Sequence, residues 1–284
     1  MVLRLGCAVW AYRGWLGGLY PPQTKASEFL STYSRRLSAV EGNAPFYAIP
    51  SVATLAQWRE ATPTGFKFCP KLFRGVTHRG SLSPQLAQAQ TVLARLQHLG
   101  DRLGPVMIQL PPSYGPNQME DLSWFLKALP AETSTEIDLA VEVRHPDWFS
   151  PATAPQLNDG LQHRGAGRIL LDTRPVYESP DDPQQQSQRR KPRLPLQPVV
   201  TAPFTIVRYI GHPDLERNRG YLDEWAGRIA SWLQQGTVVY LFIHCPQEAR
   251  SPAILEAFHQ SLVAAGAVIP PLTWGREPDQ LSLF

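Results

Sequence analysis

The amino-acid sequence predicts an α/β fold, a single (β/α)8 barrel, on three observations. Eight short apolar runs recur along the 284 residues, and each is rich in Val, Ile, Leu or Phe, as are strands that are covered on both faces. Stretches with helical periodicity separate these runs. The chain is 43% apolar, enough for one large core, and eight strand–helix units suit a closed barrel better than an open sheet.

The expected strands are brief runs that begin near the N-terminus. They are Leu3–Trp10, Ala39–Asn43, Phe66–Lys71, Val106–Leu110, Leu139–Arg144, Arg168–Asp172, Thr205–Tyr209 and Val238–His244. Between them, apolar residues repeat at three- and four-residue spacing, as in helices with one buried face. Residues 26–40, 221–233 and 253–263 follow this pattern, and Ser83-Pro84 is typical of a helix start.

Two segments fall outside the repeat and set the expected domain boundaries. Residues 1–268 form the predicted barrel, and residues 269–284 form a C-terminal tail. Within the barrel, residues 179–198 contain five prolines, a glutamine run and a basic cluster, so we expect an extended insertion loop between strands six and seven. This loop is either a solvated insertion or a functional segment, namely a mobile lid or an arm that contacts phosphate.

Composition and missing motifs exclude several classes of protein. A formal net charge of +3 is too small to indicate nucleic-acid binding by charge alone. The three cysteines are far apart and odd in number, which excludes a disulfide framework and fits a reducing compartment. No apolar run approaches 18 residues, so we expect a cytoplasmic protein without a membrane partner. The sequence also lacks GxGxxG, GxxxxGK[ST], GxSxG and HExxH motifs.

Polar residues end nearly every predicted strand. Alternate side chains of a barrel strand point inward, and the carboxyl ends of the strands form the catalytic face. The predicted inward polar residues at this face are Glu41, Asn43, Lys71, Gln109, Glu142, Arg144, Asp172, Arg208 and His244. Unpaired buried charges are costly, so this pattern predicts an active site, with a structural layer of salt bridges as the alternative.

The residue types suggest roles in such a site. Glu41, Glu142 and Asp172 are the candidate catalytic residues, as general acid, general base or ligands of a hard cation. Lys71, Arg144 and Arg208 are candidates for holding a phosphate or carboxylate, with Asn43 and Gln109 orienting it and His244 contributing from the last strand. Cofactors stay unknown, because a divalent metal fits these residue types but no ligand spacing requires one.

Two further side chains lie just beyond the strands. Tyr47 follows the second strand, where an aromatic ring would either stack on a sugar or base or close the top of the barrel. His145 follows the fifth strand, and packing and ligand binding are equally compatible with its position.

Seven ordered sequence blocks resemble the YecE-like family, domain of unknown function 72. They are GCAVWAYRGW, VEGNAPFYAIPS, TPTGFKFCPK, LGDRLGPVMIQLPPSY, LAVEVRHPDWF, VRYIGH and YLDEWAGRI. The resemblance covers residues 3 to 263 and implies a TIM-like barrel, but no particular reaction. The chain also departs from the family pattern: Gly42 replaces the usual Ile between Glu41 and Asn43, and His244-Cys245 replaces Asn residues at the end of the last strand.

The tail contains a second resemblance. Gln280, Leu281, Ser282, Leu283 and Phe284 are similar to the peptide by which bacterial proteins bind the DNA polymerase sliding clamp. A polar leader would present the two apolar anchors to a groove. Alternatively, the tail folds back onto its own barrel.

The sequence therefore predicts an enzyme, of hydrolase or lyase type, for an anionic ligand such as a phosphorylated sugar or nucleic-acid fragment. Glu142 is the expected general base and Glu41 its partner acid. The alternative is a nucleic-acid-binding accessory protein without catalysis, recruited by the sliding clamp.

Overall fold

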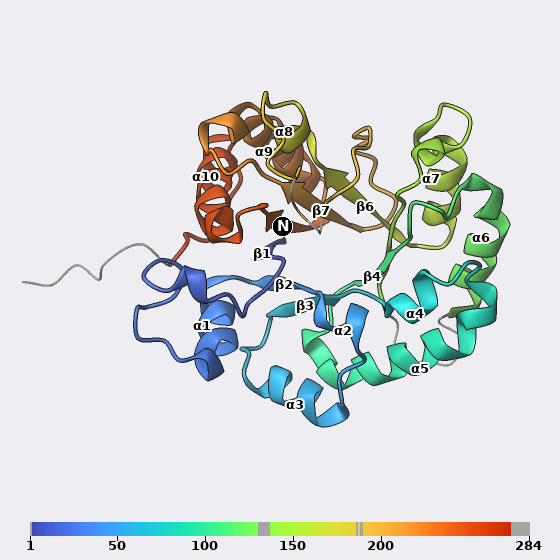
Figure 1. The fold of residues 1–284 in the computed structure, drawn as a ribbon, viewed down its shortest axis with the longest axis horizontal. Coiled ribbons are helices and arrows are strands. Elements are labelled where there is room, and N and C mark those ends of the chain that lie inside the picture. The colour runs from blue at the N-terminus through green and yellow to red at the C-terminus, as the bar shows by residue number, and fades with distance from the viewer. Residues whose placement is uncertain (1, 130–136, 186, 188–189, 274–284) are drawn as a thin grey trace, which may run out of the picture.

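The computed structural model describes residues 2–129, 137–185, 187 and 190–273 of the chain (Figure 1). These residues form an α/β fold whose paired strands are all parallel. The strands are β1 Leu3–Cys7, β2 Ala39–Gly42, β3 Lys67–Pro70, β4 Val106–Gln109, β5 Leu139–Glu142, β6 Gly167–Asp172, β7 Phe204–Ile210 and β8 Val238–His244. Seven of them begin and end within two residues of the predicted runs, and β1 ends three residues early.

Helices connect the strands in sequence order and lie outside them in Figure 1. They are α1 Phe29–Arg36, α2 Ala44–Tyr47, α3 Val52–Glu60, α4 Arg74–Thr77, α5 Leu86–Leu96, α6 Met119–Ala128, α7 Ala154–His163, α8 Arg174–Tyr177, α9 Arg219–Gln234 and α10 Ser251–Ala264. The predicted helices 221–233 and 253–263 are confirmed within α9 and α10. Of the predicted helix 26–40, only the part that forms α1 is α-helical, because the chain turns into β2 at Ala39.

The strands form two sheets, and their order follows the sequence. Six strands pair in the order β1-β8-β7-β6-β5-β4, and β2 pairs with β3. Single bridges join the two sheets on one side, between Phe68 and Leu103 and between Lys71 and Met107. The ladder of the described residues is therefore not continuous around all eight strands.

A tyrosine hydroxyl interrupts the ladder on the other side, between β1 and β2. The Tyr33 hydroxyl accepts a hydrogen bond from the Cys7 amide at 2.7 Å and donates one to the Ala39 carbonyl at 3.0 Å. The strands still approach closely, because a Cβ on Gly6 would lie 2.1 Å from the Ala39 carbonyl oxygen. Glycine is therefore required at this position in β1.

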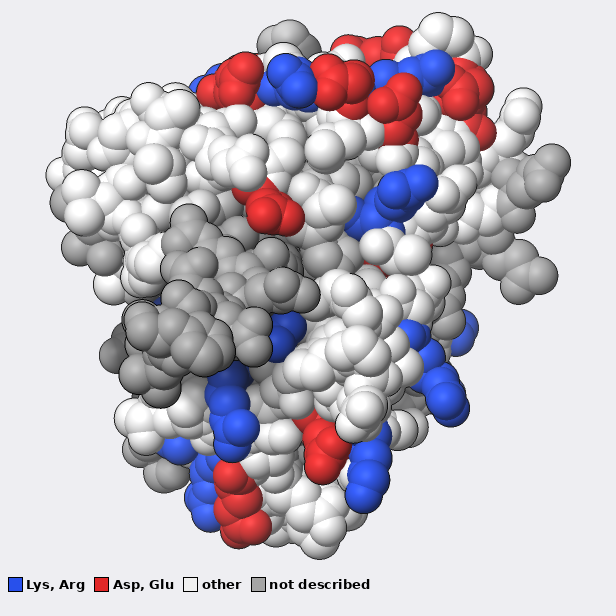
Figure 2. All heavy atoms as spheres, turned by 90° about the vertical axis from the view of Figure 1, so that its left-hand side faces the viewer, with Lys and Arg blue, Asp and Glu red and all other residues white. Residues whose placement is uncertain are grey.

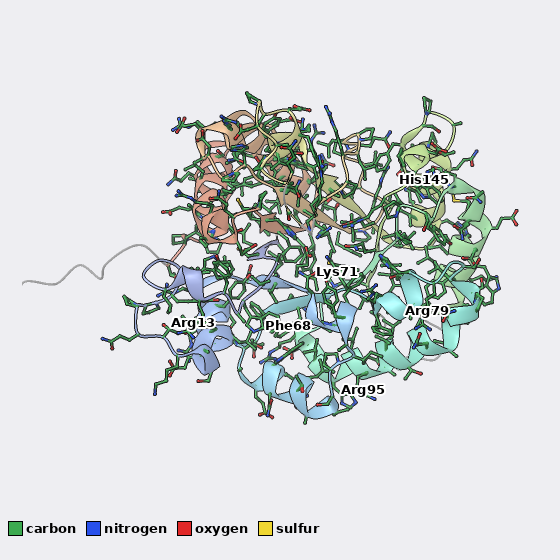
Figure 3. The ribbon with its side chains drawn as sticks, in the orientation of Figure 1. Arg13, Phe68, Lys71, Arg79, Arg95 and His145 are labelled. Atoms are coloured by element: carbon green, nitrogen blue, oxygen red, sulfur yellow. The ribbon has the colours of Figure 1, made fainter. Side chains whose placement is uncertain are left out.

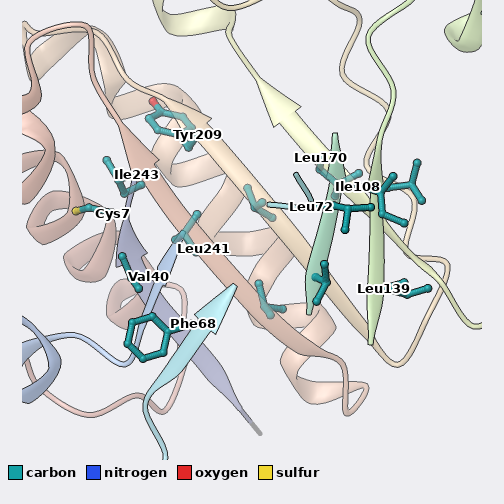
Figure 4. Close-up of a cluster of buried hydrophobic side chains, with 14 of the residues drawn as sticks. Cys7, Val40, Phe68, Leu72, Ile108, Leu139, Leu170, Tyr209, Leu241 and Ile243 are labelled. Carbon is teal, nitrogen blue, oxygen red and sulfur yellow. The ribbon is translucent and has the colours of Figure 1, made fainter. Parts of the chain in front are cut away.

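The larger core lies between the strands and the helices. Its strand residues include Val40, Phe68, Ile108, Leu170 and Leu241, which alternate with residues of the opposite face (Figure 4). Burial of these aliphatic and aromatic side chains supplies the main driving force for folding.

A second, smaller apolar cluster lies on the opposite face of the strands. Its members come from seven strands and are Ala39, Cys69, Met107, Ala140, Ile169, Phe204, Ile206, Tyr240 and Phe242. Since β2 and β3 contribute to it together with five strands of the larger sheet, both sheets share this interior. The next residue on this face, two positions further along each strand, lies at the carboxyl end.

The segment between α8 and β7 contains no strand or helix in its described residues. Side chains hold it in place at several points. The Tyr177 hydroxyl donates to the Lys191 carbonyl, the Lys191 amide donates to Gln184 at 3.0 Å, and Thr173 donates to the Pro192 carbonyl at 3.2 Å. These contacts fix the course of Lys191 and its neighbours.

The last described residues pack at the other end of the molecule from the carboxyl ends of the strands. Ile269 and Leu272 contact the larger core, and the Pro270 carbonyl lies 2.8 Å from Nε2 of His259. On the face drawn in Figure 2, described basic and acidic side chains are interspersed. Among the described residues, no helix has the length and apolar character needed to cross a membrane.

Candidate active site

Six polar residues continue the interior face at the carboxyl ends of the strands. They are Glu41, Lys71, Gln109, Glu142, Arg208 and His244, and each follows a member of the small apolar cluster by two residues. All six are buried. Figure 3 shows Lys71 at the centre of the molecule. The alternation of strand side chains therefore brings together most of the predicted site.

Arg208 is the centre of this group. Its guanidinium binds Glu41 through two hydrogen bonds, of 2.7 and 2.9 Å, and also donates to Glu142. Glu142 accepts a further hydrogen bond from Arg144 at 2.6 Å. Arg144 in turn donates to Gln109 at 2.9 Å. A bidentate arginine between two carboxylates holds both in fixed orientations.

Glu41 has two more partners besides the arginine. The Lys71 Nζ lies 2.7 Å from one of its oxygens, and Nε2 of His244 lies 2.8 Å from the other. Since an ionised carboxylate only accepts hydrogen bonds, Nε2 of His244 carries the proton that is donated. We refer to these six residues and Arg144 together as the charge layer.

The two glutamates of the charge layer are held ionised. Burial alone would raise the pKa of Glu41, but Arg208, His244 and Lys71 hold it well below the ordinary value. Arg144, Arg208 and Lys71 likewise overcome burial and lower the pKa of Glu142 to about 2. Both carboxylates are therefore weak bases at neutral pH.

The nitrogen groups of the layer titrate differently. Burial and the Arg208 charge lower the pKa of Lys71 to about 8, despite the opposing effect of the two glutamates. Burial, with a smaller contribution from Arg208, lowers the pKa of His244 to about 3, so this ring is neutral at pH 7. Lys71 is thus the group in the layer whose charge changes closest to neutral pH.

A cleft of about 600 Å³ opens beside the charge layer. Its lining residues are Pro112, Arg144, Tyr177, Asp182, Arg190, Lys191, Pro192 and Arg193. Arg190 pairs with Asp182 at 2.6 Å and lies over the Tyr177 ring. The loop between α8 and β7 therefore supplies most of this wall.

Lys191 is a member of the site that strand alternation does not predict. Burial and the charges of Arg208, Lys71 and Arg144 lower its pKa well below the ordinary value, with only Glu41 opposing them. No ion pair joins it to any residue within the described parts of the chain. The basic run in the sequence is a signal for such a residue, but not for its position.

Glu248 is a second carboxyl near the layer that strand alternation does not identify. It lies in the turn after β8, and its carbonyl accepts a hydrogen bond from the Trp15 indole at 2.9 Å. Its Oε1 is buried and has no hydrogen-bond partner among the described residues. Burial and the charge of Glu41 raise its pKa to about 7, although Ser251 and Lys191 lower it in part.

Asp172 lies apart from the other predicted catalytic residues. Ile169 faces the interior, so Asp172 faces the helices, and the expectation that it points inward is wrong. Its carboxylate accepts hydrogen bonds from the Trp225 indole at 2.7 Å and from Arg174 at 2.9 Å. In this structure Asp172 links β6 to α8 and α9.

Three predicted ligand-binding residues lie at the margin of the site. The Asn43 amide donates to the Ala8 carbonyl at 2.7 Å, which joins the ends of β1 and β2. Tyr47 is 56% exposed and packs edge-on against Phe46. His145 accepts a hydrogen bond from the Asp147 amide and lies toward the edge of the molecule in Figure 3.

The described residues contain no group of three or more His, Cys, Asp or Glu side chains arranged to hold a metal ion. The charged side chains of Lys71 and Arg208 occupy the positions next to the Glu41 and Glu142 carboxylates that a metal ion would need. The predicted clamp-binding residues 280–284 lie outside the described residues.

The fold and the site together define an α/β protein with parallel strands and a buried charge layer at their carboxyl ends. The chain belongs to the family described as "Protein of unknown function DUF72", whose model matches residues 4–277. This membership confirms the resemblance in the sequence blocks.

Relatives and solved structures agree with this assignment. The chain is 36% identical to UPF0759 protein YecE of Escherichia coli K12 over 262 residues, which cover 90% of this chain and 92% of YecE. It is 29% identical over 168 residues to UPF0759 protein YunF of Bacillus subtilis, covering 56% and 58% of the two chains. Crystal structures of DUF72 family proteins from Enterococcus faecalis and Thermotoga maritima both match with a TM-score of 0.68. Their sequence identities are 16% and 20%; the first match covers 99% of this chain and 100% of the other, and the second 93% and 99%.

Proposed function

We propose that this protein is an enzyme of hydrolase or lyase type that acts on an anionic substrate, such as a phosphorylated sugar or a nucleic-acid fragment. The observation that carries this proposal is the buried charge layer beside a cleft whose lining includes Arg144, Lys191 and Arg193. In this proposal the eight strands work as one (β/α)8 barrel, whose carboxyl-end loops build the site. The apolar cluster shared by seven strands supports that arrangement.

Lys71 is the proposed proton-transfer group in this enzyme. Its pKa of about 8 lets it gain and lose a proton near neutral pH, and its side chain is buried to 6% exposure. Glu41 and Glu142, which the sequence pattern predicts as acid and base, instead position Lys71, Arg208 and Arg144. The arginines would neutralise the charge of the substrate.

Phosphorus NMR on a panel of sugar phosphates and short oligonucleotides, with and without Mg²⁺, tests the proposal. We expect conversion of at least one compound and a loss of at least 100-fold in kcat in Lys71→Met, because general acid–base catalysis contributes about 10²–10⁴-fold. The matched control is Lys67→Met, at the other end of β3, where Nζ bonds the Asp101 carbonyl at 2.8 Å. Unchanged turnover in a folded Lys71→Met would refute the role of Lys71.

The second candidate is a nucleic-acid-binding accessory protein that the sliding clamp recruits. One observation favours it: Ile269–Thr273 line a surface with Leu3, Arg4 and Gly65, at the amino ends of β1 and β3. The last described residue, Thr273, thus lies at the end of the molecule opposite the charge layer. A clamp bound there would leave the cleft accessible.

Fluorescence anisotropy with purified sliding clamp separates the two candidates. If residues 280–284 are the clamp-binding peptide, the full chain binds with micromolar Kd and residues 1–279 do not bind. The same two chains are then titrated with DNA at increasing salt, since contacts to phosphates make affinity fall steeply with salt. Equal clamp binding by both chains would contradict the recruitment hypothesis.

A further inference from the structure

The cations around the cleft outnumber the carboxylates. With Lys191 protonated, Lys71, Arg144, Lys191 and Arg208 carry four positive charges, and Glu41 and Glu142 carry two negative charges. Exposed Arg193 adds a positive charge at the rim, and Glu248 is about half ionised at neutral pH. The remaining excess is between two and three positive charges.

The excess is concentrated on one side of the layer. Both oxygens of Glu41 and both oxygens of Glu142 already have cationic or histidine partners. Arg144 uses Nε and one terminal nitrogen for Glu142 and Gln109, and no described residue accepts from its Nη1. Lys191 and Arg193 likewise have no ion pair within the described chain, and all three residues line the cleft.

We propose that Lys191, Arg144 and Arg193 bind the terminal phosphate dianion of a phosphomonoester substrate. This inference rests on the proposed function, because it names the group by which the anionic substrate is held. A phosphate dianion suits this excess of charge, and its three oxygens can accept from the three donors, which line one cleft and come from the end of β5 and from the loop between α8 and β7. A carboxylate offers one charge and two oxygens and would leave Lys191 or Arg193 without a partner.

Lys191 gives the site a specific signature. In the free protein, burial and the charges of Arg208, Lys71 and Arg144 disfavour the charged form of Lys191. Glu41 opposes them, Glu248 also interacts with Lys191, and His244 is neutral. A bound dianion would favour the ammonium form. Binding is therefore coupled to the uptake of a proton, which a structural or purely peripheral lysine would not produce.

Isothermal titration calorimetry with sulfate and with inorganic phosphate measures both effects. Sulfate does not titrate near neutral pH, so any protons taken up belong to the protein. We expect net proton uptake when sulfate binds, seen as a dependence of the heat on the ionisation enthalpy of the buffer. Lys191→Met should reduce this uptake and weaken the binding of both anions at least tenfold. Lys127→Met, at an exposed lysine of α6, should change neither.

The variants also separate failure of this inference from failure of the proposed function. Suppose that Arg144→Gln lowers the affinity for sulfate while Lys191→Met leaves affinity and proton uptake unchanged. Lys191 is then not part of the phosphate site, but the proposed function, which needs only an anion-binding site, is still supported. If malonate binds more tightly than phosphate, the phosphate assignment is wrong. If no variant alters the binding of any anion and none of the phosphorylated panel is converted, the proposed function is wrong as well.

Discussion

Replacement of Arg208 by methionine is expected to lower the free energy of unfolding by about 3–5 kcal/mol, because it leaves buried carboxylates without their main partner. Arg208 is fully buried and binds Glu41 through two hydrogen bonds and Glu142 through a third. Methionine keeps an unbranched, flexible side chain but removes the charge, the donors and the volume of the guanidinium end. Urea denaturation followed by tryptophan fluorescence measures the loss.

A second variant keeps this prediction testable if the single variant fails to fold. Buried ion pairs can often be replaced as a unit by neutral residues at little cost, since the desolvation penalty disappears with the charges. Glu41→Gln/Glu142→Gln/Arg208→Met should therefore be more stable than Arg208→Met alone. Arg219→Gln is the control, because the exposed Arg219–Glu216 pair should contribute less than about 1 kcal/mol. A folded Arg208→Met as stable as the natural chain would show that the layer does not depend on Arg208.

The charge layer shows what strand periodicity can predict. Once Glu41, Gln109 and Glu142 are placed at strand ends, the period of two gives their shared face without knowledge of the structure. Ion pairing within the layer also follows, since buried charges require partners. The same sequence could not assign which carboxylate would be a base, because that depends on the number of cations each one meets in space.

The sequence does not predict the positions of Asp172, Lys191 and Glu248, for a different physical reason. Asp172 is predicted to point inward because it ends an apolar run. In the structure, Ile169 of β6 faces the interior, so Asp172 lies on the opposite face of the strand. A shift of one residue in the assumed alternation exchanges the two faces of a strand. Lys191 lies in a loop, and Glu248 lies in a 3-10 helix of three residues, which is too short to show a periodicity. Their positions depend on contacts with residues distant in sequence, such as the hydrogen bond between Trp15 and the Glu248 carbonyl.

The interrupted ladder has a comparable local origin. The alternating pattern predicts eight strands, and the described residues form eight, each paired with neighbours in sequence order within its sheet. The Tyr33 hydroxyl between β1 and β2 replaces a direct backbone contact, and the apolar spacing of α1 predicts only that Tyr33 is buried. Periodicity therefore specifies the burial of a side chain but not the polar bond made by its end.

The stability of the protein is expected to fall as the pH falls from about 5 toward 2, and Glu142 is expected to account for about 3 kcal/mol of this change. Its pKa is lowered from 4.5 to about 2 in the folded protein. A carboxyl with a depressed pKa contributes stability that is fully present above its unfolded pKa and is lost as the pH falls through its folded pKa. A tenfold difference in proton affinity between the folded and unfolded states corresponds to about 1.4 kcal/mol.

Urea denaturation at pH 7, 5, 4 and 3 tests this expectation with Glu142→Gln as the matched variant. The amide cannot titrate, so the variant should be less stable at pH 7 but should lose less stability on acidification. The pKa of Glu41 is shifted in the same direction, and its effect remains in the variant. Glu60→Gln, at an exposed position in α3, should retain the full pH dependence of the natural chain. Parallel pH profiles for Glu142→Gln and the natural chain would contradict the assignment, because the ion pairs of Glu142 would then be no stronger in the folded protein than its interactions with water in the unfolded chain.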